Sequence, residues 1–316
     1  MPSRFVNRCP PAKESAFMST PLSQHCPDWA TALCAGFSQI FLQRQPMCGV
    51  MCLLAIAVGA PELLGGALLG GAAGLLTAQR RDYPKAQRQA GLYSYNGILL
   101  GLLLSHTMPW SALLPLLIIA SAGTSALLTH QWLKRAPGFA VYTAPFVGIG
   151  WILLALVNEP APALINEQVI NGWTLLLALF KGVGQAMLLP HPICGLLIVL
   201  GLCLSHWRAA LWALLGSLAG LAWGLYAHDT APALNGLVSY NPVLIALAVS
   251  QQSPSRWLPL LGIALALLLT PLFSALGLPT LTAPFIAAGW LIQAGLRGRD
   301  SQAQRANKAG RLPVKR

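Results

Sequence analysis

Long apolar runs, separated by short polar or proline-containing segments, follow one another along the chain from residue 29 to residue 296. In the first half they occupy residues 29–44, 47–60, 62–78, 91–106, 110–129 and 139–157. A helix needs about 20 apolar residues to cross the hydrocarbon core of a bilayer, and several of these stretches are shorter. The pattern predicts an all-α polytopic membrane protein in which at least one segment of each half does not cross fully.

The sequence contains an internal repeat: three blocks of the first half have equivalents in the second half, in the same order. In both copies a Tyr-Asn pair, Tyr95-Asn96 or Tyr240-Asn241, lies at the start of an apolar run. The blocks align at offsets of 146, 145 and 139 residues: Ala35–Gly49 with Lys181–Gly195, Gln89–Leu104 with the segment around Gly236–Val249, and Tyr142–Leu153 with Leu281–Ile292. The sequence therefore predicts two related halves.

Loop charges indicate how the two halves are oriented. Gln79–Ala90 carries four basic residues and His130–Gly138 carries two, whereas their equivalents, Tyr226–Ala233 and Ser274–Thr280, carry none. Basic loops usually lie in the cytoplasm. The connection Asn158–Asn171 contains two glutamates and no lysine or arginine, which suits the external side. We expect two inverted five-span repeats, each with a re-entrant half-helix, and both termini in the cytoplasm; the pattern does not show which stretch is re-entrant.

This reading divides the chain into five parts. They are a disordered cytoplasmic N-terminal tail at residues 1–28, a first membrane repeat at 29–157, an external connection at 158–171, a second membrane repeat at 172–296 and a basic cytoplasmic tail at 297–316. The first 28 residues contain no continuous apolar core before a cleavage site, so we do not expect a signal peptide there.

Composition supports the membrane assignment and limits the possible partners. The chain is 55% hydrophobic and only 9% charged, whereas about a quarter of the residues of a soluble domain are charged. Its net charge of +12 arises largely from the tails and one loop, with seven of the 20 basic residues after Leu296. Basic residues beside membrane spans usually set orientation. We therefore expect the lipid bilayer as a partner and no nucleic acid.

The interior offers no charge for catalysis or ion coupling. All eight acidic residues lie in tails, in loops or at the start of a span, and none of the seven cysteines forms a CxxC pair. A proton- or sodium-coupled carrier normally keeps an ionisable residue in its core. The chain also has no Walker loop, HExxH motif or nucleophile elbow. We expect no enzyme, no metal and no cofactor, but passive movement of a neutral solute.

Four kinds of uncharged polar residue recur at equivalent positions of the two repeats. They are Gln39 and Gln185, Ser94 and Ser239, Asn96 and Asn241, and Thr143 and Thr282. An amide that leaves water without new hydrogen bonds loses about 2–7 kcal/mol, which a row of oxygens would offset. A single one of these residues could equally be a polar contact between two helices. Their symmetric recurrence favours a polar path.

Three motifs resemble the urea transporter family: the G-x-x-Q segments that end at Gln39 and Gln185, the GLYSYNGILLG block, and the T-x-P-F blocks at Thr143 and Thr282. The resemblance extends over about residues 29–295. It implies a homotrimer with a pore through each protomer, built from ten spans and two re-entrant half-helices. It further implies channel-like facilitated diffusion of urea, here across a bacterial-type inner membrane.

The resemblance also implies roles for particular residues. Gln39 and Gln185 would bind urea amides at two slots, and Thr143 and Thr282 would line the constriction between them. Backbone carbonyls near Ser94, Asn96, Ser239 and Asn241 would form ladders of oxygens, with Ile98 and Val243 as apolar walls.

The sequence departs from the family at the aromatic clamp. Family members often place an aromatic residue three positions after the first glutamine and two before the asparagine, where this chain has Leu42 and Ser94. The clamp would then come from Phe41, Phe146 or Phe285, or be looser, and selectivity for urea over small amides is open. Two alternatives follow: a channel for another small neutral amide or polar solute, and a structural or signalling membrane protein without a water-lined path.

Overall fold

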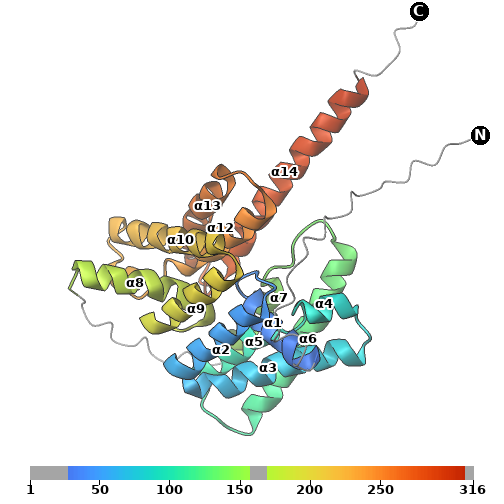
Figure 1. Ribbon diagram of the computed structural model, residues 1–316, viewed down its shortest axis with the longest axis vertical. Coiled ribbons are helices and arrows are strands. Elements are labelled where there is room, and N and C mark those ends of the chain that lie inside the picture. Colours follow the sequence, from blue (N-terminus) through green and yellow to red (C-terminus); the bar gives the residue numbers. More distant parts are fainter. Residues whose placement is uncertain (1–27, 157–168, 310–316) are drawn as a thin grey trace, which may run out of the picture.

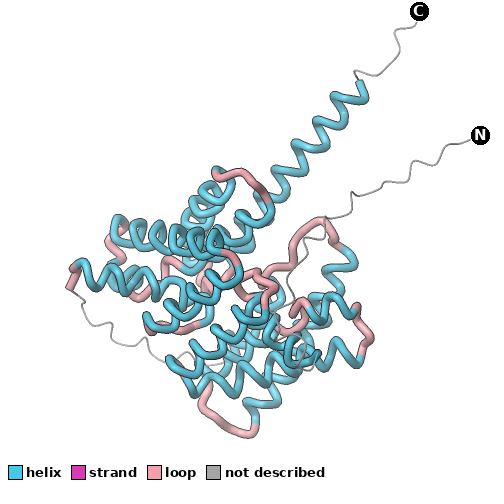
Figure 2. Tube along the Cα trace, in the orientation of Figure 1, coloured by secondary structure: helices cyan, strands magenta, loops and turns pink. Residues whose placement is uncertain are grey.

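The computed structural model describes residues 28–156 and 169–309, with side chains described up to residue 298. The expected N-terminal tail, most of the connection between the repeats and the last seven residues lie outside these ranges. Within them every regular element is helical, and the helices are joined by short connections (Figure 2). This confirms the expected all-α class.

Each half of the chain supplies seven α-helices (Figure 1). The first half contains α1 (Asp28–Gln39), α2 (Pro46–Gly59), α3 (Pro61–Arg80), α4 (Lys85–Gln89), α5 (Tyr95–Thr107), α6 (Leu113–Arg135) and α7 (Ala144–Leu156). The second contains α8 (Gly172–Gly184), the 3₁₀ turn η2 (Gln185–Met187), α9 (Pro192–Ser205), α10 (Trp207–Tyr226), α11 (Thr230–Leu234), α12 (Tyr240–Gln252), α13 (Trp257–Ala275) and α14 (Ala283–Ala309). Helices one to seven of the first half therefore correspond in order to those of the second.

Helix length separates two kinds of membrane segment. In the described part of the chain, α3, α6, α10 and α13 are long and apolar enough to cross a bilayer. The stretch from α8 to α9 also passes that test when taken as one segment, but it bends by 77° at its break. The equivalent break separates α1 from α2. Both breaks follow the G-x-x-Q glutamine and end at a proline, which removes a backbone N–H and favours the first turn of a new helix.

Glycines bring the long and short helices into close contact. A Cβ atom added to Gly70 of α3 would lie 2.0 Å from the carbonyl oxygen of Gly97 on α5. In the second half, a Cβ on Gly216 of α10 would lie 2.6 Å from the carbonyl oxygen of Pro242 on α12. Small residues allow such approaches between membrane helices. As a result α5 and α12 are buried on nearly all sides.

The two halves contact one another reciprocally. The indole nitrogen of Trp151 donates to the carbonyl oxygen of Pro279 at 2.8 Å, and the equivalent Trp290 donates to that of Ala140 at 2.9 Å. Helix α2 packs against α9 at the boundary between the blue-to-green half and the yellow-to-red half (Figure 1). Reciprocal contacts between equivalent residues are what a two-fold relation produces.

Candidate functional site

Two equivalent threonines meet where the halves face each other. The Thr143 and Thr282 hydroxyl oxygens are 2.6 Å apart and share a hydrogen bond, and both residues are buried. Each lies directly before a short apolar helical segment, α7 or the start of α14. The structure thus brings together two hydroxyls from residues 139 positions apart, one from each half of the chain.

The backbone before each threonine has an unusual conformation. Tyr142 and Leu281, which immediately precede the threonines, have positive φ angles of 45° and 38°. Bulky residues seldom adopt this left-handed region, and they do so where the surrounding structure fixes them. The carbonyl oxygen of Tyr142 accepts a hydrogen bond from the hydroxyl of Tyr95, and that of Leu281 accepts one from the Asn241 amide at 3.1 Å. The turn that presents each threonine is therefore held by the helix beside it.

Tyr142 is an asymmetric part of this arrangement that the sequence reading missed. Its hydroxyl accepts hydrogen bonds from the amide nitrogens of Gln252, at 2.8 Å, and Gln293, at 2.9 Å. Its ring packs at a tilt against Phe285, with the centroids 4.8 Å apart. The equivalent position holds Leu281, so the repeat gave no signal for it.

Asn96 and Asn241 accept hydrogen bonds from backbone N–H groups at the starts of other helices. The side-chain oxygen of Asn96 accepts a hydrogen bond from the backbone N–H of Phe146, and that of Asn241 accepts one from Phe285, both at 3.2 Å. These N–H groups lie in the first turns of α7 and α14, where a helix has no partners of its own. An asparagine buried in an apolar run thus has a defined task in both repeats.

The G-x-x-Q motifs place α1 and α8 against the serines. A Cβ on Gly36 would lie 2.2 Å from the Ser94 hydroxyl oxygen, and a Cβ on Gly182 would lie 2.5 Å from the Ser239 Cβ. Only glycine permits these approaches. The glutamine follows three residues later, at the break between the helices. The motif therefore places Gln39 and Gln185 three residues after the glycines that contact the serines.

The two glutamines have different surroundings. The side-chain oxygen of Gln39 is buried and has no hydrogen-bond partner in the described part of the chain. The amide nitrogen of Gln185 donates to the backbone carbonyl of Asn235 at 3.0 Å. The Asn235 side chain in turn accepts a hydrogen bond from Lys181 at 3.3 Å. Lys181 lies in the last turn of α8, so Asn235 links this turn to Gln185.

The expected apolar walls and aromatic residues are all buried. Ile98 and Val243 lie on α5 and α12 one turn after the serines, and they share one core cluster with Phe41, Phe146 and Phe285. Phe146 and Phe285 lie three residues after the threonines, on the helices that the asparagines cap. Phe41 lies two residues after Gln39, in the break between α1 and α2. All five of these residues are therefore buried and uncharged.

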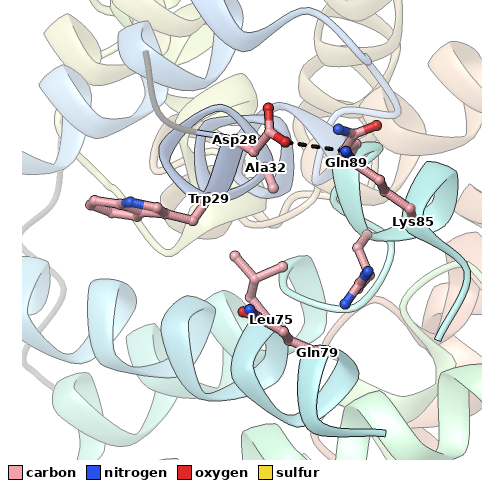
Figure 3. A pocket seen from close by; sticks show the side chains of 8 residues that line it. Asp28, Trp29, Ala32, Leu75, Gln79, Lys85 and Gln89 are labelled. Carbon is pink, nitrogen blue, oxygen red and sulfur yellow. Dashed lines mark ion pairs between the residues drawn. The ribbon is translucent and has the colours of Figure 1, made fainter. Parts of the chain in front are cut away.

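The described residues contain no group of three side chains suited to hold a metal ion. A small hollow of about 240 Å³ lies where α1, α3 and α4 meet, away from the threonines (Figure 3). Its Asp28 forms an ion pair with Lys85 at 3.3 Å, which joins the start of α1 to α4. Because both side chains are mostly exposed, the pair contributes little to stability.

Apolar helices, broken segments and a neutral polar centre between two related halves define a class: a helical membrane transport protein for an uncharged solute. A model of the urea transporter family matches residues 30–296, and the chain belongs to that family. This is a family of transporters, so the prediction that the chain is not an enzyme is confirmed.

Known relatives agree with the family assignment. Proteins named Urea transporter 1 from Ovis aries and Capra hircus are each 26% identical to this chain over 297 residues, which cover 83% of this chain and 74% of theirs. The protein of the same name from Rattus norvegicus is 26% identical over 295 residues, with the same coverage.

Proposed function

We propose that this urea transporter carries urea passively, through a path within one chain that passes between Thr143 and Thr282. The observation that carries the proposal is the hydrogen bond between these two buried hydroxyls at the meeting of the halves. A hydroxyl both donates and accepts, so each threonine can exchange its bond to the other for a bond to urea. Urea then loses its water at the constriction without losing all of its hydrogen bonds.

The groups on either side of the threonines fit a flat, neutral diamide. The unpartnered oxygen of Gln39 is an acceptor for a urea N–H group. Gln185, fixed by Asn235, is the equivalent group in the other half. Ile98, Val243 and the rings of Phe146 and Phe285 provide apolar surfaces that cannot replace the water of a hydrated ion. Urea therefore passes and ions do not.

Orientation and assembly belong to the same proposal. Reciprocal contacts such as Trp151 with Pro279 and Trp290 with Ala140 support two inverted repeats, related by an axis that we place in the membrane plane. With five crossings in each repeat both termini are cytoplasmic, in agreement with the basic loops of the first half. We further propose, from the family resemblance, a homotrimer in a bacterial-type inner membrane.

A stopped-flow experiment on proteoliposomes tests passive transport. We expect urea influx to exceed that of empty liposomes, to stop at equal concentrations, and to be the same at pH 5.5 and pH 8 and with or without a proton gradient. No side chain that lines the proposed path titrates between these values. Accumulation of urea against its gradient, or a flux no faster than through empty liposomes, would contradict the proposal.

A channel for small amides in general is the second candidate, because Leu42 stands where the family often has an aromatic residue. Leu42 is only partly buried and has a left-handed backbone, with φ of 60°. Acetamide in the same assay distinguishes the candidates. Influx of urea well above that of acetamide supports a urea-selective channel, and equal rates support the broader one.

A further inference from the structure

A cavity of about 750 Å³ lies at the start of α10, where the connection between α12 and α13 meets the connection between α1 and α2. None of the residues assigned to the urea path lines it. The cavity is within the range of volumes that hold small-molecule ligands. Its lining combines cationic, hydroxyl and apolar side chains, and this combination indicates what it binds.

The lining of the cavity carries uncompensated positive charge. Arg208 and Arg256 both line it, and no aspartate or glutamate does. In the part of the chain whose side chains are described, neither arginine forms an ion pair, since the one ion pair there joins Lys85 to Asp28. The guanidinium of Arg208 lies over the ring of Trp207, 5.6 Å from its centroid. Arginine presents several N–H donors in a fork that matches the oxygens of a phosphate.

Hydroxyl groups stand beside the two arginines. Ser253 and Ser255 line the same cavity, and the Ser253 hydroxyl oxygen accepts a hydrogen bond from the backbone N–H of Ser255 at 3.2 Å. The hydroxyl hydrogen of Ser253 is then available to donate to an anion. Two guanidinium groups with a hydroxyl donor make a site for phosphate oxygens.

The lining of the cavity also contains exposed apolar side chains. Leu211 and Leu215 line it, follow each other one turn apart on α10 and are 48% and 46% exposed. A free phosphate has nothing to contact on such a wall, whereas the acyl chains of a lipid do. Trp207 and Trp257, 61% and 79% exposed, are the kind of residue that marks the level of lipid headgroups.

We propose that this cavity binds a phospholipid, with its phosphate on Arg208 and Arg256 and its acyl chains along Leu211 and Leu215. The site is separate from the urea path, so the proposal does not rest on the mechanism of transport. An anionic headgroup such as that of phosphatidylglycerol binds more tightly than that of phosphatidylcholine, because the choline cation is repelled by the arginines.

Native mass spectrometry of the detergent-purified protein, titrated with phosphatidylglycerol, tests the site. We expect one lipid bound to the wild type and an apparent affinity at least ten-fold lower for Arg208→Gln/Arg256→Gln. The matched control is Arg80→Gln/Arg81→Gln, which removes the same charge from the end of α3, outside the cavity, and should bind as the wild type does. Equal binding by the wild type and the Arg208→Gln/Arg256→Gln protein would overturn the proposal.

Further arms of the experiment separate lipid from other occupants. Leu211→Ser/Leu215→Ser should also weaken lipid binding, and glycerol 1-phosphate should not displace the lipid at equal concentration. Displacement by glycerol 1-phosphate would mean a site for soluble phosphates and overturn the lipid assignment. A change in oligomer mass without a change in bound lipid, in Arg208→Gln/Arg256→Gln, would show instead that a second copy of the chain covers the cavity.

Folding of the variants is checked by size-exclusion chromatography and urea flux, both expected to match the wild type. If the double variant does not fold, the wild type alone provides the test. Its affinity for phosphatidylglycerol should fall as sodium chloride rises from about 50 to about 500 mM, because salt screens the arginine–phosphate attraction. An affinity independent of salt would overturn the proposed headgroup site.

Discussion

Two buried asparagines support helices other than their own. Asn96 lies in the first turn of α5 but accepts a hydrogen bond from α7, and Asn241 makes the equivalent contact from α12 to α14. The threonines directly precede the N-termini of the capped helices. The asparagines therefore hold the helices that begin directly after Thr143 and Thr282, and in the proposed path they act through the position of these threonines.

Substitution of Asn96 by alanine tests this role. The change leaves the Phe146 N–H buried without a partner, and we expect the free energy of unfolding to fall by about 1–3 kcal/mol. Thermal unfolding in detergent measures the change. Thr124→Ala is the control, since the Thr124 hydroxyl is exposed and bonds only within α6, to Ala120. If Asn96→Ala unfolds at the same temperature as this control, Asn96 is not a structural cap.

The sequence predicted that these asparagines have a task but not which one. The recurrence of Tyr-Asn in both repeats identified the positions, and the resemblance assigned the task to nearby carbonyls. The capped N–H groups belong to residues 50 and 44 positions away, and nothing in the local pattern shows such a partner. Tyr142 escaped notice for a related reason: its partners Gln252 and Gln293 lie in the other half, and its equivalent is a leucine.

At the scale of helices, glycine contacts determine how deeply α5 and α12 are buried. In the first half, Cβ atoms on Gly70 and Gly66 of α3 would lie 2.0 and 2.7 Å from the backbone carbonyl oxygens of Gly97 and Gly101 on α5. Close contact places the starts of α5 and α12, with their serines and asparagines, against the breaks that carry the glutamines. The glycines therefore determine the positions of the candidate site residues as well as the packing of the helices.

Substitution of Gly70 by alanine should separate α3 from α5. The new Cβ would lie 2.0 Å from the Gly97 carbonyl oxygen, so the helices must shift, and we expect a loss of about 1–3 kcal/mol of stability. Gly148→Ala, on the exposed side of α7 with nothing within 4 Å, is the matched control and should be neutral or slightly stabilising. Equal unfolding temperatures for the two variants would show that α3 and α5 tolerate a wider spacing.

The apolar pattern of the sequence predicted where most helices lie, but not where a helix is interrupted within an apolar stretch. Each of the six apolar stretches expected in the first half contains a helix, because burial in lipid requires the backbone to bond within itself. The stretch expected at residues 29–44, however, ends as a helix at Gln39, since Leu42 takes a left-handed conformation. Leucine gives no local signal of such a turn, as glycine would. The equivalent turn occurs at Leu188.

At the scale of the whole molecule, the two halves form one structure around a shared centre. The threonine pair, the two tryptophan contacts and the packing of α2 on α9 all join equivalent parts of the two repeats. On the proposed path, a solute that passes the threonines would meet the groups of one half and then those of the other. The path would be neutral, with a polar slot on each side of a single constriction.

Inverted orientation makes a prediction about accessibility. Arg80 and Tyr226 are equivalent residues at the ends of α3 and α10, and both are exposed. In a background without native cysteines, we expect a membrane-impermeant maleimide added outside intact cells to label Tyr226→Cys and not Arg80→Cys. Inside-out vesicles should give the reverse. Labelling of both residues from the same side would mean parallel repeats and would contradict the proposed topology.

The central claim is that urea passes between Thr143 and Thr282, and their double substitution by valine tests it most directly. Valine keeps the shape of threonine but cannot bond urea, and an amide without partners costs about 1–3 kcal/mol, which corresponds to roughly a ten-fold loss of rate. Stopped-flow urea influx into proteoliposomes is the measurement, with Thr124→Val as the control. We predict that Thr143→Val/Thr282→Val lowers urea permeability about ten-fold or more, while the control matches the wild type. Unchanged urea permeability in a folded double variant would place the path elsewhere.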